Sequence, residues 1–369
     1  MSDVATAPSP TSLGRALTLL QTHEVERRTE LTRLLGLTRT ATGTVLRELE
    51  ELSLVRSGPT TGDERPGATG RPSHAIAVHP EAPAALGVQV QAESLLVAEV
   101  GLGGTVGPTD EVPLRDREPG RVLDLAADVV AARIGGLDQG CVGVGVAVPS
   151  AVGADGTAFS ALNLGWPGSV PVGPMLRERL AARDLEVDVH VGNDANLAAL
   201  AEHRHGAGRA ATDLLYLMSA QRGVGGGLVR RGVLHTGSAG YALEVGHVSV
   251  RTRGRLCHCG NQGCLEVETD ARALAQASPR VVARRLATGL ATLVNVLNPD
   301  RIVLAGLYAD LLASHGDLLR SLLSAQSFLD QAAHVDLRPG LLASPSLVGA
   351  AELAFRDLLT DPRAVLGAG

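Results

Sequence analysis

The sequence predicts an N-terminal winged helix-turn-helix followed by an α/β body of two lobes. Short helical patterns meet at Gly36, and a stretch rich in Gly, Pro and Thr at 58–72 separates two strand-like runs; both features predict the winged head. Strand-like and helical segments then alternate over about 280 residues, which predicts the body. A chain of 369 residues also exceeds what one ordinary core accommodates.

The predicted head follows a tail at 1–10, which we expect to be disordered. Apolar residues recur at helical spacing from Ser12, and a second helix fits 29–35 before Gly36 ends it. Thr38 can cap a third helix. The apolar positions of that helix share one face: Val45, Leu46, Leu49 and Leu52.

A wing completes the head. Strand-like runs at 55–56 and 75–78 flank the 58–72 stretch, which we interpret as a hairpin with a flexible tip. The winged helix-turn-helix domain is therefore placed at 11–80.

The body shows the alternation of an α/β protein. Its strands are predicted at 86–90, 95–100, 142–148, 187–191, 214–218, 226–229 and 302–304. Its helices include 122–134, 174–183, 196–205 and 280–297. Length predicts two lobes that meet near residue 205, at 81–205 and 206–369.

Charge and composition narrow the function classes. Net charge is −6, which argues against a protein that coats nucleic acid generally. Residues 1–80 carry nine Arg and nine Asp plus Glu, so an electrically neutral head precedes an acidic body. The chain has no lysine, which excludes a Walker A phosphate loop. No signal peptide or membrane-length apolar run is evident, so we expect a cytoplasmic protein without membrane contact.

Three of the four cysteines cluster within eight residues. Cys257, Cys259 and Cys264 have a spacing that can wrap one metal ion, with glycines that permit the turn. His247, ten residues upstream, is the best fourth ligand, whereas His258 between two ligands is expected to point away. The alternative is three buried free thiols. Four protein ligands predict structural zinc, held by the zinc loop 247–264.

A second polar cluster, Gly-Asn-Asp-Ala-Asn at 192–196, follows a predicted strand directly. Carboxylates at the carboxyl end of a parallel strand suit ligand hydroxyls, and Asp194 can also act as a general base. The alternative is that Asp194 caps the helix that follows. A glycine run at 223–227 between two predicted strands is interpreted as a structural hairpin.

Two longer runs, 241–250 (YALEVGHVSV) and 254–266 (GRLCHCGNQGCLE), resemble the signature of the ROK family of repressors, open reading frames and sugar kinases. The resemblance covers essentially the whole chain, including a wing that ends in Gly-Arg-Pro-Ser at 70–73. It implies a duplicated, two-lobed actin/hexokinase-like (ribonuclease H-like) body with a sugar in the cleft.

The resemblance also implies the site residues. Its sugar ligands would be Asn163, Asn193, Asp194, Glu244, His247 and Glu266. Its zinc ligands would be His247, Cys257, Cys259 and Cys264. His247 would bind zinc through one ring nitrogen and the sugar through the other. Asp194 matches the catalytic base of the family's kinases.

One departure from the family's kinases favours a non-enzymatic role. Those kinases hold ATP phosphates with an Asp-x-Gly-Gly-Thr loop, where this chain has 89–94 (QVQAES). Gln89 replaces the Asp, Gln91 and Ala92 replace the glycines, and Glu93 replaces the Thr. Lost glycines block close backbone approach, and Glu93 repels a polyphosphate. We therefore expect no kinase activity, with Asp194 a vestigial base.

Helix-turn-helix proteins read bases with the N-terminal residues of the second helix. The candidate DNA contacts are Thr38, Arg39, Thr40, Thr42, Thr44 and Arg47, with Arg71 of the wing directed at a minor groove.

These residues predict a sugar-responsive repressor of carbohydrate-metabolism genes. Its partners would be double-stranded operator DNA and a sugar or sugar-phosphate effector, and the protein would be a homodimer or higher homo-oligomer. Two alternatives stay open: an active glucose-type kinase with an accessory DNA-binding head, and a constitutive DNA-binding protein with a vestigial cleft.

Overall fold

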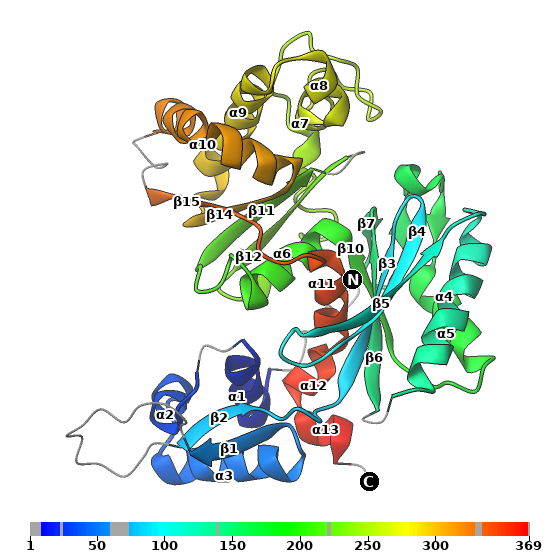
Figure 1. The fold of residues 1–369 in the computed structure, drawn as a ribbon, viewed down its shortest axis with the longest axis vertical. Helices are drawn as coiled ribbons and strands as arrows, with labels where there is room; N and C mark the ends of the chain where they lie inside the picture. Colours follow the sequence, from blue (N-terminus) through cyan, green and yellow to red (C-terminus); the bar gives the residue numbers. More distant parts are fainter. Residues whose placement is uncertain are drawn as a thin grey trace.

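The computed structural model describes residues 9–22, 25–59, 74–137, 140–219, 223–328 and 334–367. It consists of a helical head with a two-stranded ribbon and two sheet-containing lobes (Figure 1). This arrangement agrees with the predicted winged head and two-lobed α/β body. None of the described helices combines the length and apolar composition that a membrane crossing requires.

The head contains the three predicted helices and the wing strands. They are α1 (Ser12–Gln21), α2 (Arg28–Leu35), α3 (Arg39–Glu51), β1 (Val55–Pro59) and β2 (His74–Val78). Gly36 ends α2 in the left-handed conformation at φ 66°. The hydroxyl of Thr38 accepts the backbone N–H of Ala41 at 3.2 Å and caps α3 as predicted. The wing tip, Arg71 included, lies outside the described residues.

The first lobe is built on a five-stranded sheet of order β10-β6-β3-β4-β5. Its strands are β3 (Ala84–Val90), β4 (Ser94–Val100), β5 (Val106–Pro113), β6 (Cys141–Val148) and β10 (Val189–Asn193). Helices α4 (Pro119–Ile134) and α5 (Val172–Ala181) pack together and share a core with the sheet. A small second sheet contains β7 (Ala151–Val152), β8 (Ala158–Phe159) and β9 (Ser169–Val170).

The second lobe repeats this plan with the order β13-β12-β11-β14-β15. Its strands are β11 (Asp213–Ser219), β12 (Val224–Arg230), β13 (Val233–Leu234), β14 (Arg301–Gly306) and β15 (Asp336–Pro339). In both sheets three strands pair antiparallel and the next two join in parallel. This is the duplication that the resemblance implied. The helices are α7 (Leu265–Thr269), α8 (Ala271–Gln276), α9 (Pro279–Leu297) and α10 (Leu307–Gln326).

Two helices lie between the sheets: α6 (Asp194–His205) and α11 (Pro345–Ala354) (Figure 1). Helix α11 packs on β3 and β6 of the first lobe and on α6. The approach is close because glycines face it; a Cβ on Gly87 would lie 2.5 Å from the backbone oxygen of Leu347.

The C-terminal helices therefore depart from the predicted boundary of the second lobe at 206–369. After α11, α12 (Arg356–Thr360) and α13 (Pro362–Leu366) continue to the head (Figure 1). Apolar residues of α11 and α12, together with Phe355 between the two helices, share one core with α1 and α3. The chain folds back because these apolar faces complete a core that the short head cannot close alone.

Candidate functional site

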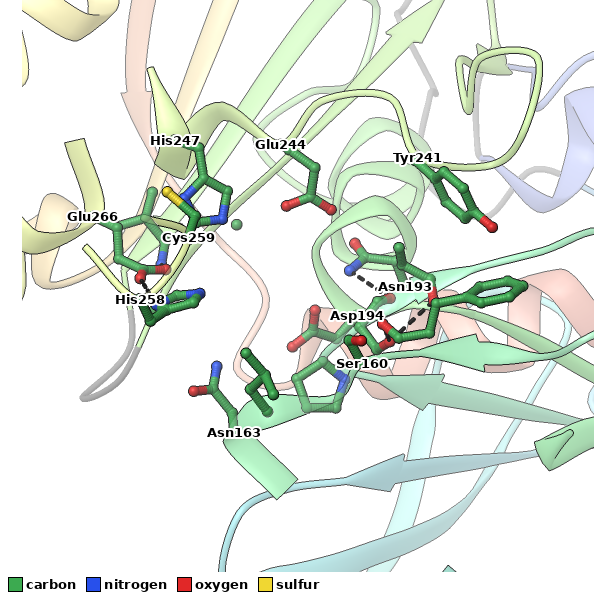
Figure 2. A pocket seen from close by; sticks show the side chains of 18 of the residues that line it. Ser160, Asn163, Asn193, Asp194, Tyr241, Glu244, His247, His258, Cys259 and Glu266 are labelled. Carbon is green, nitrogen blue, oxygen red and sulfur yellow. Dashed lines mark hydrogen bonds and ion pairs between the residues drawn. The ribbon is translucent and has the colours of Figure 1, made fainter. Parts of the chain in front are cut away.

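A cavity of about 410 Å³ opens between the two lobes (Figure 2). All six predicted sugar ligands line it: Asn163, Asn193, Asp194, Glu244, His247 and Glu266. They come from 3₁₀ turns, from the junction of β10 with α6, and from the start of α7. Ser150 and Ser160 add hydroxyls. Carboxylates, amides and hydroxyls converging on one cavity are suited to a polyhydroxylated ligand.

Asn193 and Asp194 take different local roles from those considered in the sequence. Asn193, rather than Asp194, caps α6, because its Oδ1 accepts the N–H of Asn196 at 2.9 Å. Its Nδ2 donates to the carbonyl of Ser150 at 3.1 Å, which ties α6 to the end of β6. Asp194 accepts only the N–H of the adjacent Ala195, at 2.8 Å, among the hydrogen bonds of the described residues. Its carboxyl thus remains available to the cavity.

Burial raises the pKa of Asp194 to about 7; the N–H of Ala195 opposes this shift and the charge of Glu244 adds to it. Burial likewise raises the pKa of Glu244, while His247 lowers it. The carboxyl of Asp194 therefore changes protonation state close to neutral pH. Such a group can exchange a proton with a ligand hydroxyl.

Glu266 is held from two sides. Its Oε2 accepts the N–H of Val224 at 3.2 Å, and its Oε1 lies 3.0 Å from Nδ1 of His258. His258 stays outside the four-ligand set, as predicted, although its Nδ1 lies 3.9 Å from Sγ of Cys257. Its ring turns into the cavity and packs edge-on to His247, with centroids 5.3 Å apart (Figure 2). The preference for contact with Glu266 is a tertiary effect, which spacing within the zinc loop does not reveal.

An aromatic pair forms another part of the wall. Tyr241 and Phe159 meet edge-to-face with centroids 5.3 Å apart. The chain has only three Phe, three Tyr and one Trp, so two of its few aromatic residues lie at this cavity. No local pattern marked these two residues, although the scarcity of aromatic residues in the sequence was a usable signal.

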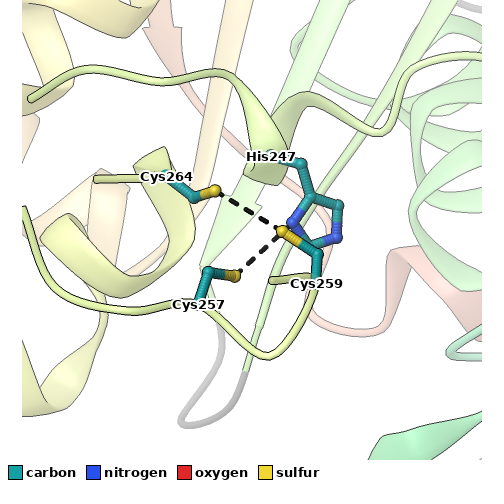
Figure 3. Close-up of side chains that lie close together, drawn as sticks. All are labelled: His247, Cys257, Cys259 and Cys264. Atoms are coloured by element: carbon teal, nitrogen blue, oxygen red, sulfur yellow. Dashed lines mark hydrogen bonds between the residues drawn. The ribbon is translucent and has the colours of Figure 1, made fainter. Parts of the chain in front are cut away.

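The four predicted metal ligands converge beside the cavity (Figure 3). Nδ1 of His247 lies 3.7 Å from Sγ of Cys257, and Sγ of Cys259 lies 3.7 Å from Sγ of Cys264. Two sulfurs on one tetrahedral zinc lie roughly 3.8 Å apart, given Zn–S bonds of about 2.3 Å. The four donor atoms are all within 4.8 Å of one another, so the set fits a single ion.

Burial affects the protonation of two thiols in this loop. Burial raises the pKa of the Cys257 thiol, and it raises that of Cys264 to about 12. Buried thiols of this kind become thiolates only beside a positive charge. Because Nδ1 of His247 faces the sulfurs, its Nε2 is the ring nitrogen left for the cavity.

The glycine run at 223–227 has a packing role within the second sheet. Gly225 and Gly227 lie inside β12, not between two strands as predicted. A Cβ on Gly227 would lie 2.6 Å from Cβ of Ala199 on α6. These glycines therefore let α6 approach the sheet closely. The run has a structural role, as predicted, but as a packing surface within β12 and not as a hairpin.

The 89–94 segment forms the turn between β3 and β4. The N–H of Gln91 donates to the carbonyl of Ser94 at 2.9 Å, and the hydroxyl of Ser94 donates to Oε1 of Gln91 at 3.1 Å. Glu93 is exposed at the tip. These two bonds close the turn within itself.

In the head, α3 presents most of the predicted DNA contacts. Thr38, Arg39, Thr40 and Arg47 are exposed, and Thr44 is half-buried. Thr42 is a correction: it is fully buried and its hydroxyl donates to the carbonyl of Thr38 at 3.0 Å.

Thr42 is buried because it shares the apolar face of α3 with Val45, Leu46 and Leu49. Arg28 was not among the predicted DNA contacts, although it lies beside them. Its guanidinium donates to the carbonyl of Arg39 at 3.0 Å, close to Gly43. Arg28, Arg33, Arg39 and Arg47 line one groove.

Comparison with known proteins agrees with this geometry. Residues 122–280 match the model of the ROK family. A xylose repressor of Caldicellulosiruptor bescii is 27% identical over 290 residues, which cover 66% of this chain and 70% of the relative. A glucokinase of Halalkalibacterium halodurans is 32% identical over 197 residues, 52% of this chain and 58% of the relative. The chain thus spans less than two thirds of that glucokinase.

Solved structures give the same fold. The crystal structure of a ROK family transcriptional regulator, a homolog of the E. coli MLC protein, matches with a TM-score of 0.77 and 19% identity, covering 96% of this chain and 98% of the other. A ROK family glucokinase from Streptomyces griseus matches with a TM-score of 0.62 and 25% identity, over 74% and 99%. The signature runs, the zinc-loop geometry and the match of residues 122–280 agree, so the chain is similar to ROK family proteins over this part.

Proposed function

We propose that this protein is a sugar-responsive transcriptional regulator, most simply a repressor of carbohydrate-metabolism genes. The observation that carries the proposal is the combination, in one chain, of a winged helix-turn-helix and a polar cavity between two kinase-like lobes. The relatives named xylose repressors support it.

The proposed DNA surface is the N-terminal half of α3 with the adjoining arginines of α2. Arg39 and Arg47 are exposed on α3, where a guanidinium can bind the edge of a guanine with two hydrogen bonds. Thr38, Thr40 and Thr44 suit phosphate or base contacts. Arg71 stays a prediction for the minor groove. We withdraw Thr42, because a buried side chain cannot contact DNA.

The proposed effector is a sugar or sugar phosphate bound by Asn163, Asn193, Asp194, Glu244, His247 and Glu266. Zinc held by His247, Cys257, Cys259 and Cys264 would fix the zinc loop, and thus the orientation of the His247 and Glu266 side chains. Xylose and glucose are the first sugars to test, since relatives are named xylose repressor and glucokinase. N-acetylglucosamine is added because the family resemblance of the sequence suggests it.

Control would come from closure of the two lobes on the sugar. In a symmetric dimer, closure would change the spacing of the two heads on a pseudo-palindromic operator. A strong change in occupancy requires that the sugar prefer one state by several kcal/mol.

One observation favours a second candidate, an ATP-dependent sugar kinase. Asp194 has a pKa near 7 and faces the cavity, as a general base for a sugar hydroxyl would. Against it, the turn at 89–94 lacks the glycines that admit phosphates and exposes Glu93 instead. Sugar-dependent ATP consumption by the purified protein would decide for the kinase.

The decisive experiment is fluorescence anisotropy of the protein on DNA from upstream of its own gene. Salt is held fixed, because phosphate contacts make affinity strongly salt-dependent. Sequence-selective binding that one sugar of the panel changes supports the regulator. Selective binding that no sugar changes indicates a constitutive DNA-binding protein, and absence of selective binding refutes the proposal.

A further inference from the structure

A buried ionic cluster joins the cavity helix α6 to the head. Glu352 of α11 is fully buried and forms an ion pair with Arg204. Its Oε1 lies 2.6 Å from Nε2 of His205. Nε2 of Gln21, the last residue of α1, donates to its Oε2 at 3.2 Å. We call Gln21, Arg204, His205 and Glu352 the Glu352 cluster.

The members of the cluster come from three elements that belong to different parts of the molecule. Arg204 and His205 form the end of α6, whose first residues, Asn193 and Asp194, line the cavity. Glu352 belongs to α11, and Gln21 to the head. A helix of 12 residues therefore has the proposed sugar at one end and the cluster at the other.

The same end of α6 holds both chain crossings between the lobes. Oε2 of Glu202 accepts the N–H of Ala207 at 2.7 Å, at the first crossing. Its Oε1 accepts the N–H groups of Leu341 and Leu342, each at 2.9 Å, at the second. Relative motion of the lobes must therefore act on the last turn of α6.

The hydrogen bond between Gln21 of the head and Glu352 is buried. Gln21 is fully buried, and its Oε1 has no hydrogen-bond partner among the described residues. The amide nitrogen of Gln21 therefore binds Glu352, while the amide oxygen stays without a partner. Buried polar atoms are rarely left without a hydrogen bond, so this oxygen calls for an explanation beyond packing. Burial alone raises the pKa of Glu352, but Arg204 and His205 outweigh this and hold it at about 2, so the carboxylate is charged.

We propose that Glu352 is a positioning residue that transmits a displacement of α6, caused by sugar in the cavity, to α1 and so to the DNA-reading head. This inference rests on the proposed function. Coupling between two sites requires an element on which both act, and α6 with the Glu352 cluster is that element.

The sharpest test is Gln21→Met in the full-length, zinc-loaded protein. Methionine keeps the volume and removes both the bond to Glu352 and the unsatisfied oxygen, so the variant should fold. The coupling factor is the ratio of DNA dissociation constants with and without saturating sugar, for whichever of D-xylose, D-glucose or N-acetylglucosamine acts on the wild type. We expect Gln21→Met to move this factor roughly tenfold toward one, with the sugar affinity of the DNA-free protein unchanged.

Thr22→Val is the matched control. Thr22 is the next residue and is also buried. Among the described residues, its hydroxyl donates only to α1 carbonyls, those of Thr18 and Leu19. It should keep the wild-type factor. Glu352→Gln should lose coupling as Gln21→Met does, with a lower melting temperature because Arg204 loses its partner.

The outcomes separate the two proposals. A wild-type factor in Gln21→Met, or an equal loss in Thr22→Val, overturns the role of the Glu352 cluster while the regulator stands. A wild-type protein whose DNA affinity none of the three sugars changes overturns the role of the cluster together with the sugar-responsive function.

Discussion

Gly225 on β12 and Ala195 on α6 are in such close contact that a Cβ on the glycine would lie 2.5 Å from Cβ of the alanine. We expect Gly225→Ala to push α6 from the second sheet and lower the free energy of unfolding by about 1–3 kcal/mol. Chemical denaturation measures this. Gly58→Ala, where nothing lies within 4 Å of the new Cβ, should change stability little; equal effects of the two substitutions would contradict the packing role.

Removal of one zinc ligand should empty the zinc loop. Cys257→Ser is expected to reduce bound zinc from about one ion per chain to well below that, since loss of a ligand or its support costs roughly 10–100-fold in metal affinity. It should also weaken sugar binding, because the metal no longer fixes the loop that carries His247. Metal analysis and sugar titration measure both. Cys141→Ser, on β6 and away from the zinc loop, is the control. A Cys257→Ser protein with full zinc and full sugar response would refute the role of zinc.

Loss of an exposed arginine on α3 should weaken operator binding. Arg39→Ala is expected to cost about 1–3 kcal/mol and to relax selectivity at one base pair. Anisotropy with operator variants measures it, with Arg338→Ala, an exposed arginine of the second lobe, as a charge-matched control. Thr42→Val should keep operator selectivity, because Thr42 is buried; reduced selectivity in that variant would show that the recognition surface is misassigned.

Stability should depend on pH through Asp194. Its pKa is raised from 3.8 to about 7, so the unfolded chain releases the proton first as pH rises. The protonated carboxyl therefore makes its full contribution to the free energy of unfolding below pH 4. This contribution is lost progressively as the pH rises to 7.

Asp194→Asn removes this dependence. Between pH 4 and pH 8, the free energy of unfolding of this variant should rise relative to that of the wild type by on the order of 2 kcal/mol. The figure is reduced because the side chain is partly accessible to solvent. Urea unfolding at several pH values measures the difference, with Asp128→Asn as the control because that exposed carboxylate pairs with Arg183 on the surface. A pH-independent difference would contradict the raised pKa.

Local patterns predicted most of this fold. Strands such as β3 and β11, and helices such as α3 and α9, were found from apolar periodicity, and Gly36 and Thr38 from their effects on helix ends. The convergence of His247, Cys257, Cys259 and Cys264 was predicted because these four donors lie within eighteen residues of sequence.

The errors concern contacts between distant segments. Thr42 was chosen for its polarity, although its position on α3 faces the core. The contact of His258 with Glu266 was not predicted. The return of α11 and α12 to the head depends on packing between residues more than 300 positions apart, such as Gln21 and Glu352, and no local pattern contains that information.

The shared core of the head and the C-terminal helices also orders events during synthesis. A ribosome completes 1–80 long before it makes Phe355 and Leu358, so the emerging head lacks part of its apolar core until translation has passed these residues. A chain interrupted earlier would carry the DNA-reading helix without the packing that fixes it. We therefore expect incomplete chains, which also lack the proposed sugar-binding body, to bind an operator poorly.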